Sequence, residues 1–129
     1  MIRQSLKDLY FAANRWLVVP NTLLVRALYR RRRDLAIHLG CGDDYREGMI
    51  NVDGNIFRRK DLWLDLRNRL PFASGSAKLI YCCHTLEHLF PDEALRLLAE
   101  MRRVLSDEGV LRLAVPSFEW CMEVAQGQA

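Results

Sequence analysis

Two glycines at the end of an apolar run are the first residues in this sequence that could serve a ligand. The run Ile-His-Leu-Gly-Cys-Gly-Asp, residues 37–43, leads an expected strand into a turn with glycines at positions 40 and 42. Without Cβ atoms, such a turn can adopt positive φ and expose amide N–H groups to an anionic or carboxylate-bearing ligand. Taken alone, the pair of glycines is equally consistent with a tight turn that binds nothing.

A carboxylate follows the next apolar run. Asp53 comes eleven residues after Gly42, directly after the run Ile-Asn-Val, and Gly54 follows it. In open α/β sheets, nucleotides bind beside the carboxyl ends of the strands, where an acidic side chain can accept two ribose hydroxyls. We therefore expect Asp53 to bind a ribose; the alternative is a solvated turn aspartate.

The third and fourth expected strands also end in polar residues. Asp65 could accept a hydrogen bond from an adenine amine while Leu66 packs on the ring, and helix or turn capping is the alternative for this carboxylate. After the run that ends in Cys83, His84 is expected to face the cleft from the end of the fourth strand. His84 is the one residue that we expect to act as a base.

His84, Glu87 and His88 also spell the H-x-x-E-H motif of a class of zinc hydrolases. The sequence offers no third ligand and no long surrounding helix, since the motif follows a strand and precedes Pro91. We therefore expect no metal site, and we expect Glu87 and His88 to form hydrogen bonds at a helix end.

The elements that position these residues follow from the apolar pattern. Short apolar runs separated by turn residues, with one long amphipathic helix among them, are typical of an α/β fold. The expected strands cover residues 35–39, 49–52, 62–64, 78–82 and 110–115. The helix begins at Pro91 and turns an apolar stripe to the sheet, made by Ala94, Leu95, Leu97, Leu98, Met101, Val104 and Leu105. Residues 106–109, Ser-Asp-Glu-Gly, then turn the chain.

Residues 1–33 are expected to form a helical arm before the domain of residues 34–129. Apolar spacings of three and four predict a helix over residues 4–17, and Pro20 is expected to begin a second helix that ends near Arg30–Arg33. Aromatic residues beside arginines in this arm resemble a helix that lies on an anionic lipid surface, which would give peripheral membrane contact. The alternative is a helix that packs on the sheet or covers the cleft and carries solvated arginines.

Length, charge and cysteines exclude several classes of protein. The 129 residues suffice for one core. Residues 1–33 hold eight Lys/Arg against one acid, whereas the rest hold eleven against fifteen, so a broad nucleic-acid-binding face is not expected. Four cysteines without a C-x-x-C pair predict reduced thiols. Neither a membrane span nor a signal peptide is expected, which favours a cytoplasmic protein.

Five ordered blocks over residues 35 to about 120 resemble class I S-adenosylmethionine-dependent methyltransferases of the type 11 group. The blocks read HLGCG, INVDG, DLRNRLPF, LIYCCHTLEHL and RRVLSDEGVLRLAVPS. The resemblance implies a three-layer Rossmann-like α/β sandwich with parallel strand order 3-2-1-4-5, and S-adenosylmethionine as cofactor. It further implies that Gly40, Cys41 and Gly42 contact the methionine moiety, Asp53 the ribose, and Asp65 and Leu66 the adenine. Cys83 and His84 would line the side of methyl transfer.

The sequence departs from that family in two places. Residues 43–48 are too few for the usual helix between the first two strands, and the chain stops soon after Trp120, before the usual sixth and seventh strands. We expect either a fragment or a shortened relative. The expected reaction is methyl transfer to a small molecule or an envelope saccharide, and the alternative is a non-catalytic binding module. A nicotinamide oxidoreductase fits less well, because the third glycine is absent and Asp53 comes too early.

Overall fold

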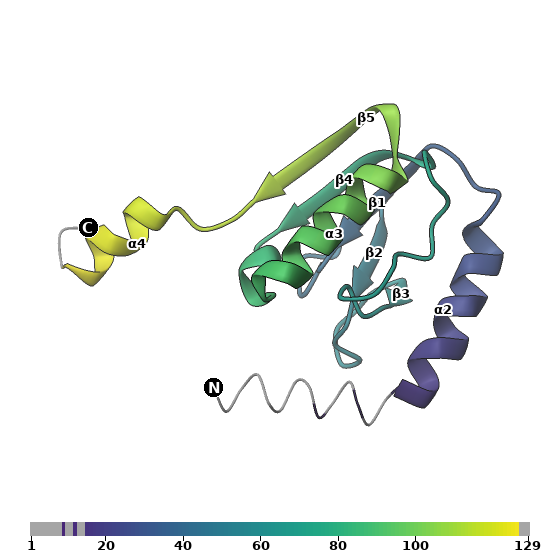
Figure 1. Ribbon diagram of the computed structural model, residues 1–129, viewed down its shortest axis with the longest axis horizontal. Helices are drawn as coiled ribbons and strands as arrows, with labels where there is room; N and C mark the ends of the chain where they lie inside the picture. Colours follow the sequence, from purple (N-terminus) through teal and green to yellow (C-terminus); the bar gives the residue numbers. More distant parts are fainter. Residues whose placement is uncertain (1–8, 10–11, 13–14, 127–129) are drawn as a thin grey trace.

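A parallel five-stranded sheet forms the centre of the molecule (Figure 1). The computed structural model describes residues 9, 12 and 15–126. The strands lie in the order β3-β2-β1-β4-β5, which confirms the expected α/β class and strand order. Their bounds are Leu35–Leu39 for β1, Ile50–Asp53 for β2, Leu62–Trp63 for β3, Ala77–Cys83 for β4 and Leu105–Ala114 for β5.

Strand β1 begins and ends where the sequence predicts, whereas β4 and β5 are longer than expected. The turn expected over residues 106–109 is present as a bulge at the start of β5. Ala77 of β4 pairs with Leu105, but Leu79 already pairs with Val110, so the four residues between Leu105 and Val110 leave the ladder. Because Leu105 pairs before this bulge, β5 begins five residues earlier than its apolar run suggested.

Helix α3, Pro91–Val104, packs on one face of the sheet and encloses the main core. It buries Leu97, Met101 and Val104, which lie three or four residues apart on one side of the helix. Glu93 caps the start of the helix, because its carboxylate accepts the Phe90 N–H at 3.0 Å. Leu95 was expected in the apolar stripe, but it is 65% exposed, because it lies two residues from Leu97 and therefore on another side of the helix. The sheet contributes five side chains to this core, those of Ile37, Leu39, Val52, Ile80 and Cys82.

The other face of the sheet is polar at its centre. Asn51 of β2, His38 of β1 and Tyr81 of β4 are neighbours in the register of the sheet. Alternation along the strands turns their side chains away from α3. Residues 43–48 form no helix, as their number predicted, and Arg46 from this loop lies over the face instead, with its guanidinium 4.1 Å from the centre of the Tyr81 ring. The loop after β1 therefore covers this face with the Arg46 cation and hydrogen-bonding side chains, where related folds have a helix.

Helix α2 covers Arg15–Tyr29 and contains Pro20 in its interior. The expectation that Pro20 begins a helix was wrong: the helix starts five residues earlier and continues through the proline, which costs it one main-chain hydrogen bond. Most of the helix expected over residues 4–17 lies outside the described residues. The helix packs on the core through Val25, and through Tyr29, whose ring lies edge-on to Phe72 with centroids 5.7 Å apart.

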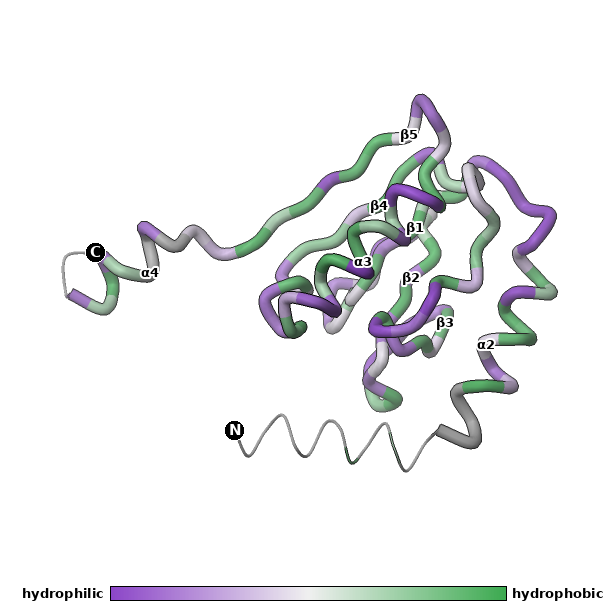
Figure 2. The backbone as a smooth tube through the Cα atoms, in the orientation of Figure 1, coloured by the Kyte–Doolittle hydropathy of each residue, from purple (hydrophilic) through white to green (hydrophobic). Residues whose placement is uncertain are grey.

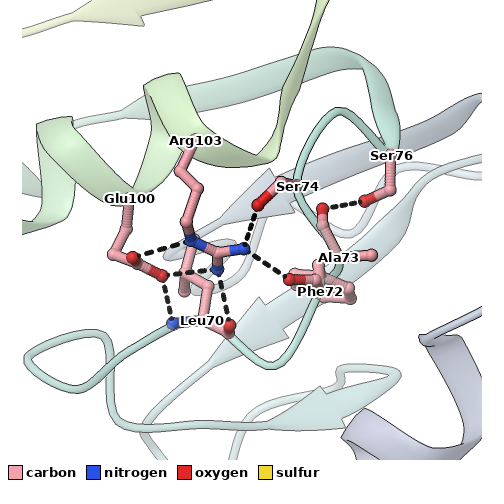
Figure 3. A network of polar contacts seen from close by, with 7 residues as sticks. All are labelled: Leu70, Phe72, Ala73, Ser74, Ser76, Glu100 and Arg103. Atoms are coloured by element: carbon pink, nitrogen blue, oxygen red, sulfur yellow. Dashed lines mark hydrogen bonds and ion pairs between the residues drawn. The ribbon is translucent and has the colours of Figure 1, made fainter.

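The segment that links β3 to β4 is fixed to α3 by an ion pair (Figure 3). Arg103 donates to both carboxylate oxygens of Glu100, at 2.8 and 2.7 Å, and to the carbonyl oxygens of Leu70 and Phe72, at 3.0 and 2.9 Å. Glu100 in turn accepts the Leu70 N–H at 2.9 Å. Arg103 therefore holds the Leu-Pro-Phe segment against α3, so that Leu70 and Phe72 enter the core.

Helix α4, Phe118–Ala125, follows β5 and lies well apart from the sheet (Figure 1). Within the described part of the chain, none of the helices has the length and apolar character needed to cross a bilayer.

Candidate functional site

The turn after β1 has the conformation that its glycines predicted. Gly40 and Gly42 have φ values of +68° and +52°, which L-residues rarely adopt. A Cβ on Gly40 would overlap the side chain of Thr85, which comes from the end of β4. A Cβ on Gly42 would meet no atom within 4 Å. Gly40 therefore permits close packing between the ends of β1 and β4, whereas Gly42 faces open space.

The amide groups of this turn are bonded within the protein, which corrects the expectation that they face a ligand. Gly40 N–H and Cys41 N–H both donate to Val52 O, at 2.8 and 3.1 Å. Gly42 N–H donates to the carboxylate of Asp53 at 2.8 Å. The end of β2 supplies all three acceptors because β1 and β2 are paired up to Leu39 and Val52. The turn thus offers a ligand a surface without side chains and not a set of free amides.

Asp53 lies at the carboxyl end of β2 and turns toward the glycine turn. Its Oδ2 accepts Gly42 N–H, and its Oδ1 accepts Asn55 N–H at 2.7 Å. A carboxylate has about four acceptor positions, so about two remain after these bonds. Two hydroxyl donors, such as those of a ribose, match that remaining capacity. The structure therefore brings together Gly42 and Asp53, which the sequence had placed eleven residues apart.

Asp65 lies beyond the end of β3, but a neighbouring arginine engages its carboxylate. Arg67 binds it from Nε and Nη2, each at 3.0 Å, and the Arg67 N–H also donates to Oδ1 at 3.0 Å. The Asp65 side chain is only 9% exposed. Any adenine amine that approached Asp65 would therefore compete with Arg67. The bond from the Arg67 N–H is the turn capping given above as the alternative for Asp65, whereas the sequence did not indicate the ion pair. Leu66, the other expected adenine contact, is partly buried against the core.

His84 follows β4 at the same edge of the sheet. It has φ +50°, an uncommon conformation for a residue other than glycine, and its N–H donates to Ala114 O of β5 at 2.9 Å. Its side chain is 64% exposed, and Nδ1 lies 3.2 Å from Glu87 Oε1. The preceding Cys83 is half-buried. These positions lie at the carboxyl end of β4, next to the glycine turn after β1, as expected.

The comparison with known protein families shows to which family the chain belongs. The sequence profile of the methyltransferase domain family matches residues 32–113, which is more than half of the chain. The chain belongs to this methyltransferase family. No curated protein and no solved structure shows significant similarity to it. Members of this family generally use S-adenosylmethionine.

The carboxyl edge of this methyltransferase fits an adenosyl ligand in two respects. The open space at Gly42 admits a ligand close to the main chain. Beside it, Asp53 retains acceptor capacity for hydroxyl groups. The third expected group, the Asp65 carboxylate, fits only if Arg67 yields part of its contact. The fit therefore depends mainly on the ends of β1 and β2.

Two cysteine side chains of the methyltransferase, those of Cys41 and Cys82, are placed for packing. Cys41 is 3% exposed, and burial raises the pKa of its thiol to about 11, so that the neutral form persists well above pH 7. Burial likewise raises the pKa of Cys82 to about 11. Cys41, Cys82 and Cys83 are free thiols, as their spacing predicted. Any ligand contact of Cys41 must come from its main chain, because the side chain points into the protein.

The region of the H-x-x-E-H motif forms a short 3-10 helix, Leu86–His88. Glu87 is engaged with His84, and His88 N–H donates to Thr85 O at 3.1 Å, which are hydrogen bonds at a helix end. Over residues 9, 12 and 15–126, no group of three His, Cys, Asp or Glu side chains is arranged to hold a metal ion.

Sequence reasoning missed several residues that shape the site. Thr85 packs on Gly40, and its hydroxyl donates to Cys83 O at 3.1 Å, which fixes the turn after β4. Asn51 accepts Arg46 N–H at 2.9 Å and donates to Arg46 O at 2.9 Å, so it anchors the loop that follows the glycine turn. The sequence did contain a signal for Asn51, because an asparagine within the apolar run of an expected strand becomes buried, and a buried amide needs hydrogen-bond partners. Nothing in the sequence indicated the partnership of Thr85 with Gly40.

Proposed function

We propose that the chain binds S-adenosylmethionine at the carboxyl ends of β1 and β2 and transfers its methyl group to a small molecule or an envelope saccharide. The observation that carries the proposal is the hydrogen bond from Gly42 N–H to Asp53 Oδ2. It sets an acceptor for ribose hydroxyls directly beside Gly42, where no side chain stands in the way of a ligand. Membership of the methyltransferase family supports the choice of cofactor.

Within this proposal, each part of the edge has a limited task. Asp53 accepts the ribose hydroxyls and so fixes the nucleoside, while the glycine turn admits the methionine end close to the main chain. The bound cofactor supplies an electrophilic methyl group on a sulfonium. Methyl transfer then depends chiefly on the alignment of the acceptor atom, so that few side chains need to react.

His84 is the residue that we propose as a base. With Nδ1 carrying the hydrogen toward Glu87, Nε2 is the basic nitrogen, and the exposed ring can take a proton from an acceptor hydroxyl or amine. The bond from its N–H to Ala114 O holds this residue at the carboxyl edge of the sheet. We propose that Cys83, the preceding residue, also lines the side of methyl transfer.

The first testable prediction concerns Asp53→Asn. Replacing the carboxylate by a neutral amide should weaken S-adenosylmethionine binding about 10- to 100-fold, because hydrogen bonds to a charged acceptor contribute about 1.5–3 kcal/mol. Isothermal titration calorimetry of the full chain measures this change. Asp107→Asn is a matched control, because its side chain is fully exposed in the β5 bulge. Equal affinity in wild type and Asp53→Asn would contradict the proposal, and so would binding of NAD in place of S-adenosylmethionine.

The non-catalytic binding module remains a second candidate, favoured by the engagement of Asp65 with Arg67. A carboxylate held in this way contributes less to a ligand than a free one. Incubating the chain with labelled S-adenosylmethionine and a panel of hydroxyl and amine acceptors separates the two candidates. Methylated product that is lost in His84→Gln supports catalysis, whereas cofactor binding without any product supports the module.

A further inference from the structure

Helix α2 exposes an apolar face although one side of it packs on the core. Val25 is 3% exposed and anchors the helix. By contrast Val19, Leu23, Leu24 and Leu28 are between 55% and 60% exposed. Pro20 and Ala27 are exposed as well. Spacings of three and four residues make these six side chains neighbours on the helix, and we call them the outer face of α2.

A cluster of arginines adjoins the outer face. Arg26 lies in the last turns of α2, and residues 30–33, four consecutive arginines, follow it; all five are exposed. Figure 2 shows this hydrophilic stretch directly after α2. No acid occurs between Asp8 and Asp34 in the sequence. The charge is therefore uniformly positive along the helix and its end.

Local contacts hold part of this cluster in place. Arg33 donates to the carbonyl oxygens of Arg30 and Arg32, at 3.4 and 3.0 Å, and so covers carbonyl groups at the end of the helix. Arg32 lies with its guanidinium 5.0 Å from the centre of the Tyr29 ring, which itself contacts Phe72 of the core. Arg32 and Arg33 are thus held at the end of α2, next to the folded body.

We infer that α2 binds the surface of an anionic lipid bilayer, with its outer face in the acyl boundary and its arginines among the phosphates. A helix with exposed leucines and a basic end matches both layers of such a surface. A second copy of the chain would bring two sets of five arginines together, which repel each other. A nucleic acid would pair with the arginines but leave the leucines in water. A lipid surface satisfies both groups.

The test is vesicle flotation with the full chain. Vesicles of phosphatidylcholine with about one third phosphatidylglycerol should carry the protein, whereas phosphatidylcholine alone should carry far less. Arg30→Gln/Arg31→Gln should weaken binding about 30-fold, since each arginine near the surface contributes about fivefold. Leu23→Ser/Leu24→Ser/Leu28→Ser should weaken it at least about 100-fold.

Matched controls come from helix α3. Leu95→Ser changes a leucine that is 65% exposed, and Arg96→Gln changes an exposed arginine, so neither should alter flotation. Circular dichroism verifies that every variant is folded. The proposal is overturned if the wild type fails to float with anionic vesicles at low salt, or if the triple leucine variant floats as well as the wild type. It is also overturned if the leucine substitutions only dissociate a dimer, because the outer face would then bind a second copy.

Discussion

At the scale of single residues, the polar face of the sheet depends on a buried chain of hydrogen bonds. His38 is 1% exposed, its Nδ1 lies 3.2 Å from Asn51 Oδ1, and its ring is edge-on to Tyr81. Asn51 also receives support from Asp61, whose Oδ2 accepts the Asn51 N–H at 2.7 Å. Burial lowers the pKa of His38 from its ordinary value of 6.5, because the interior disfavours the imidazolium.

This burial predicts a loss of stability on mild acidification. The unfolded chain binds the His38 proton more tightly than the folded protein, so the free energy of unfolding should fall as pH drops below about 6.5, by at most about 1.4 kcal/mol per pH unit. Urea unfolding between pH 7.5 and 5.5 measures the slope. His38→Gln should remove this part of the slope, whereas His88→Gln, at an exposed position, should retain it. An unchanged slope in His38→Gln would refute the assignment.

Two carboxylates also lower the free energy of unfolding on acidification, but they do so in a lower pH window than His38. In Asp61, burial raises the pKa, but hydrogen bonds from Asn51 and Tyr45 outweigh it and leave the pKa below its ordinary 3.8. In Glu100, the hydrogen bond from Arg103 lowers the pKa below its ordinary 4.5. The stability from both groups is present above these ordinary values and is lost as pH falls below them and through the lowered pKa values of the folded protein. His38 therefore accounts for the change above pH 5, and the carboxylates for the change below it.

Residue types were predictable at the site, but their partners were not. The left-handed glycines and the direction of Asp53 follow from a two-glycine turn and an acid at the ends of adjacent parallel strands. The capture of Asp65 by Arg67 and the bonding of the turn amides to Val52 did not follow. Both depend on side-chain and main-chain geometry over a few residues, which residue type and spacing leave open.

At the scale of elements, the strands and α3 were predictable because their apolar residues are periodic. The contacts of the Leu-Pro-Phe segment were not, since Arg103 reaches Leu70 and Phe72 across 33 and 31 residues of sequence. Helix α2 was predicted in two parts because Pro20 is a strong break signal. The helix continues through it, and Val25 and Tyr29 pack on the core beyond the proline.

Arg103→Lys tests how much the link between α3 and this segment contributes. Lysine cannot make the paired bonds to Glu100 and also reach two carbonyl groups, so the free energy of unfolding should drop by about 1–3 kcal/mol. The Arg103 and Glu100 side chains are only 21% and 19% exposed, so solvent screening reduces this effect little. Arg102→Lys is the matched control, because Arg102 is 74% exposed and lies 4.0 Å from Asp107. Equal urea midpoints for both variants would show that the link is dispensable.

At the scale of the whole molecule, the strand order was predictable from the resemblance to a family, but the distribution of polar and apolar surface was not. The α3 face is a continuous apolar core, whereas Arg46, Tyr81 and Arg112 gather on the other face. The outer face of α2 is also exposed. Such differences depend on how elements pack in three dimensions, and periodicity reports only that an element has an apolar side.

The candidate cofactor site directly adjoins the core along the chain, which predicts that a ligand stabilises the molecule as one unit. Leu39 and Val52, the core residues next to the glycine turn and Asp53, belong to the same buried cluster as Leu97 and Met101 of α3. S-adenosylmethionine at about 100 times its dissociation constant should therefore add about 2.7 kcal/mol to the free energy of unfolding and raise the midpoint by about 10 °C in a single calorimetric transition. Asp53→Asn at the same ligand concentration should show a much smaller shift. Two separate transitions, only one of them responsive to ligand, would mean that the strand ends unfold independently of the core.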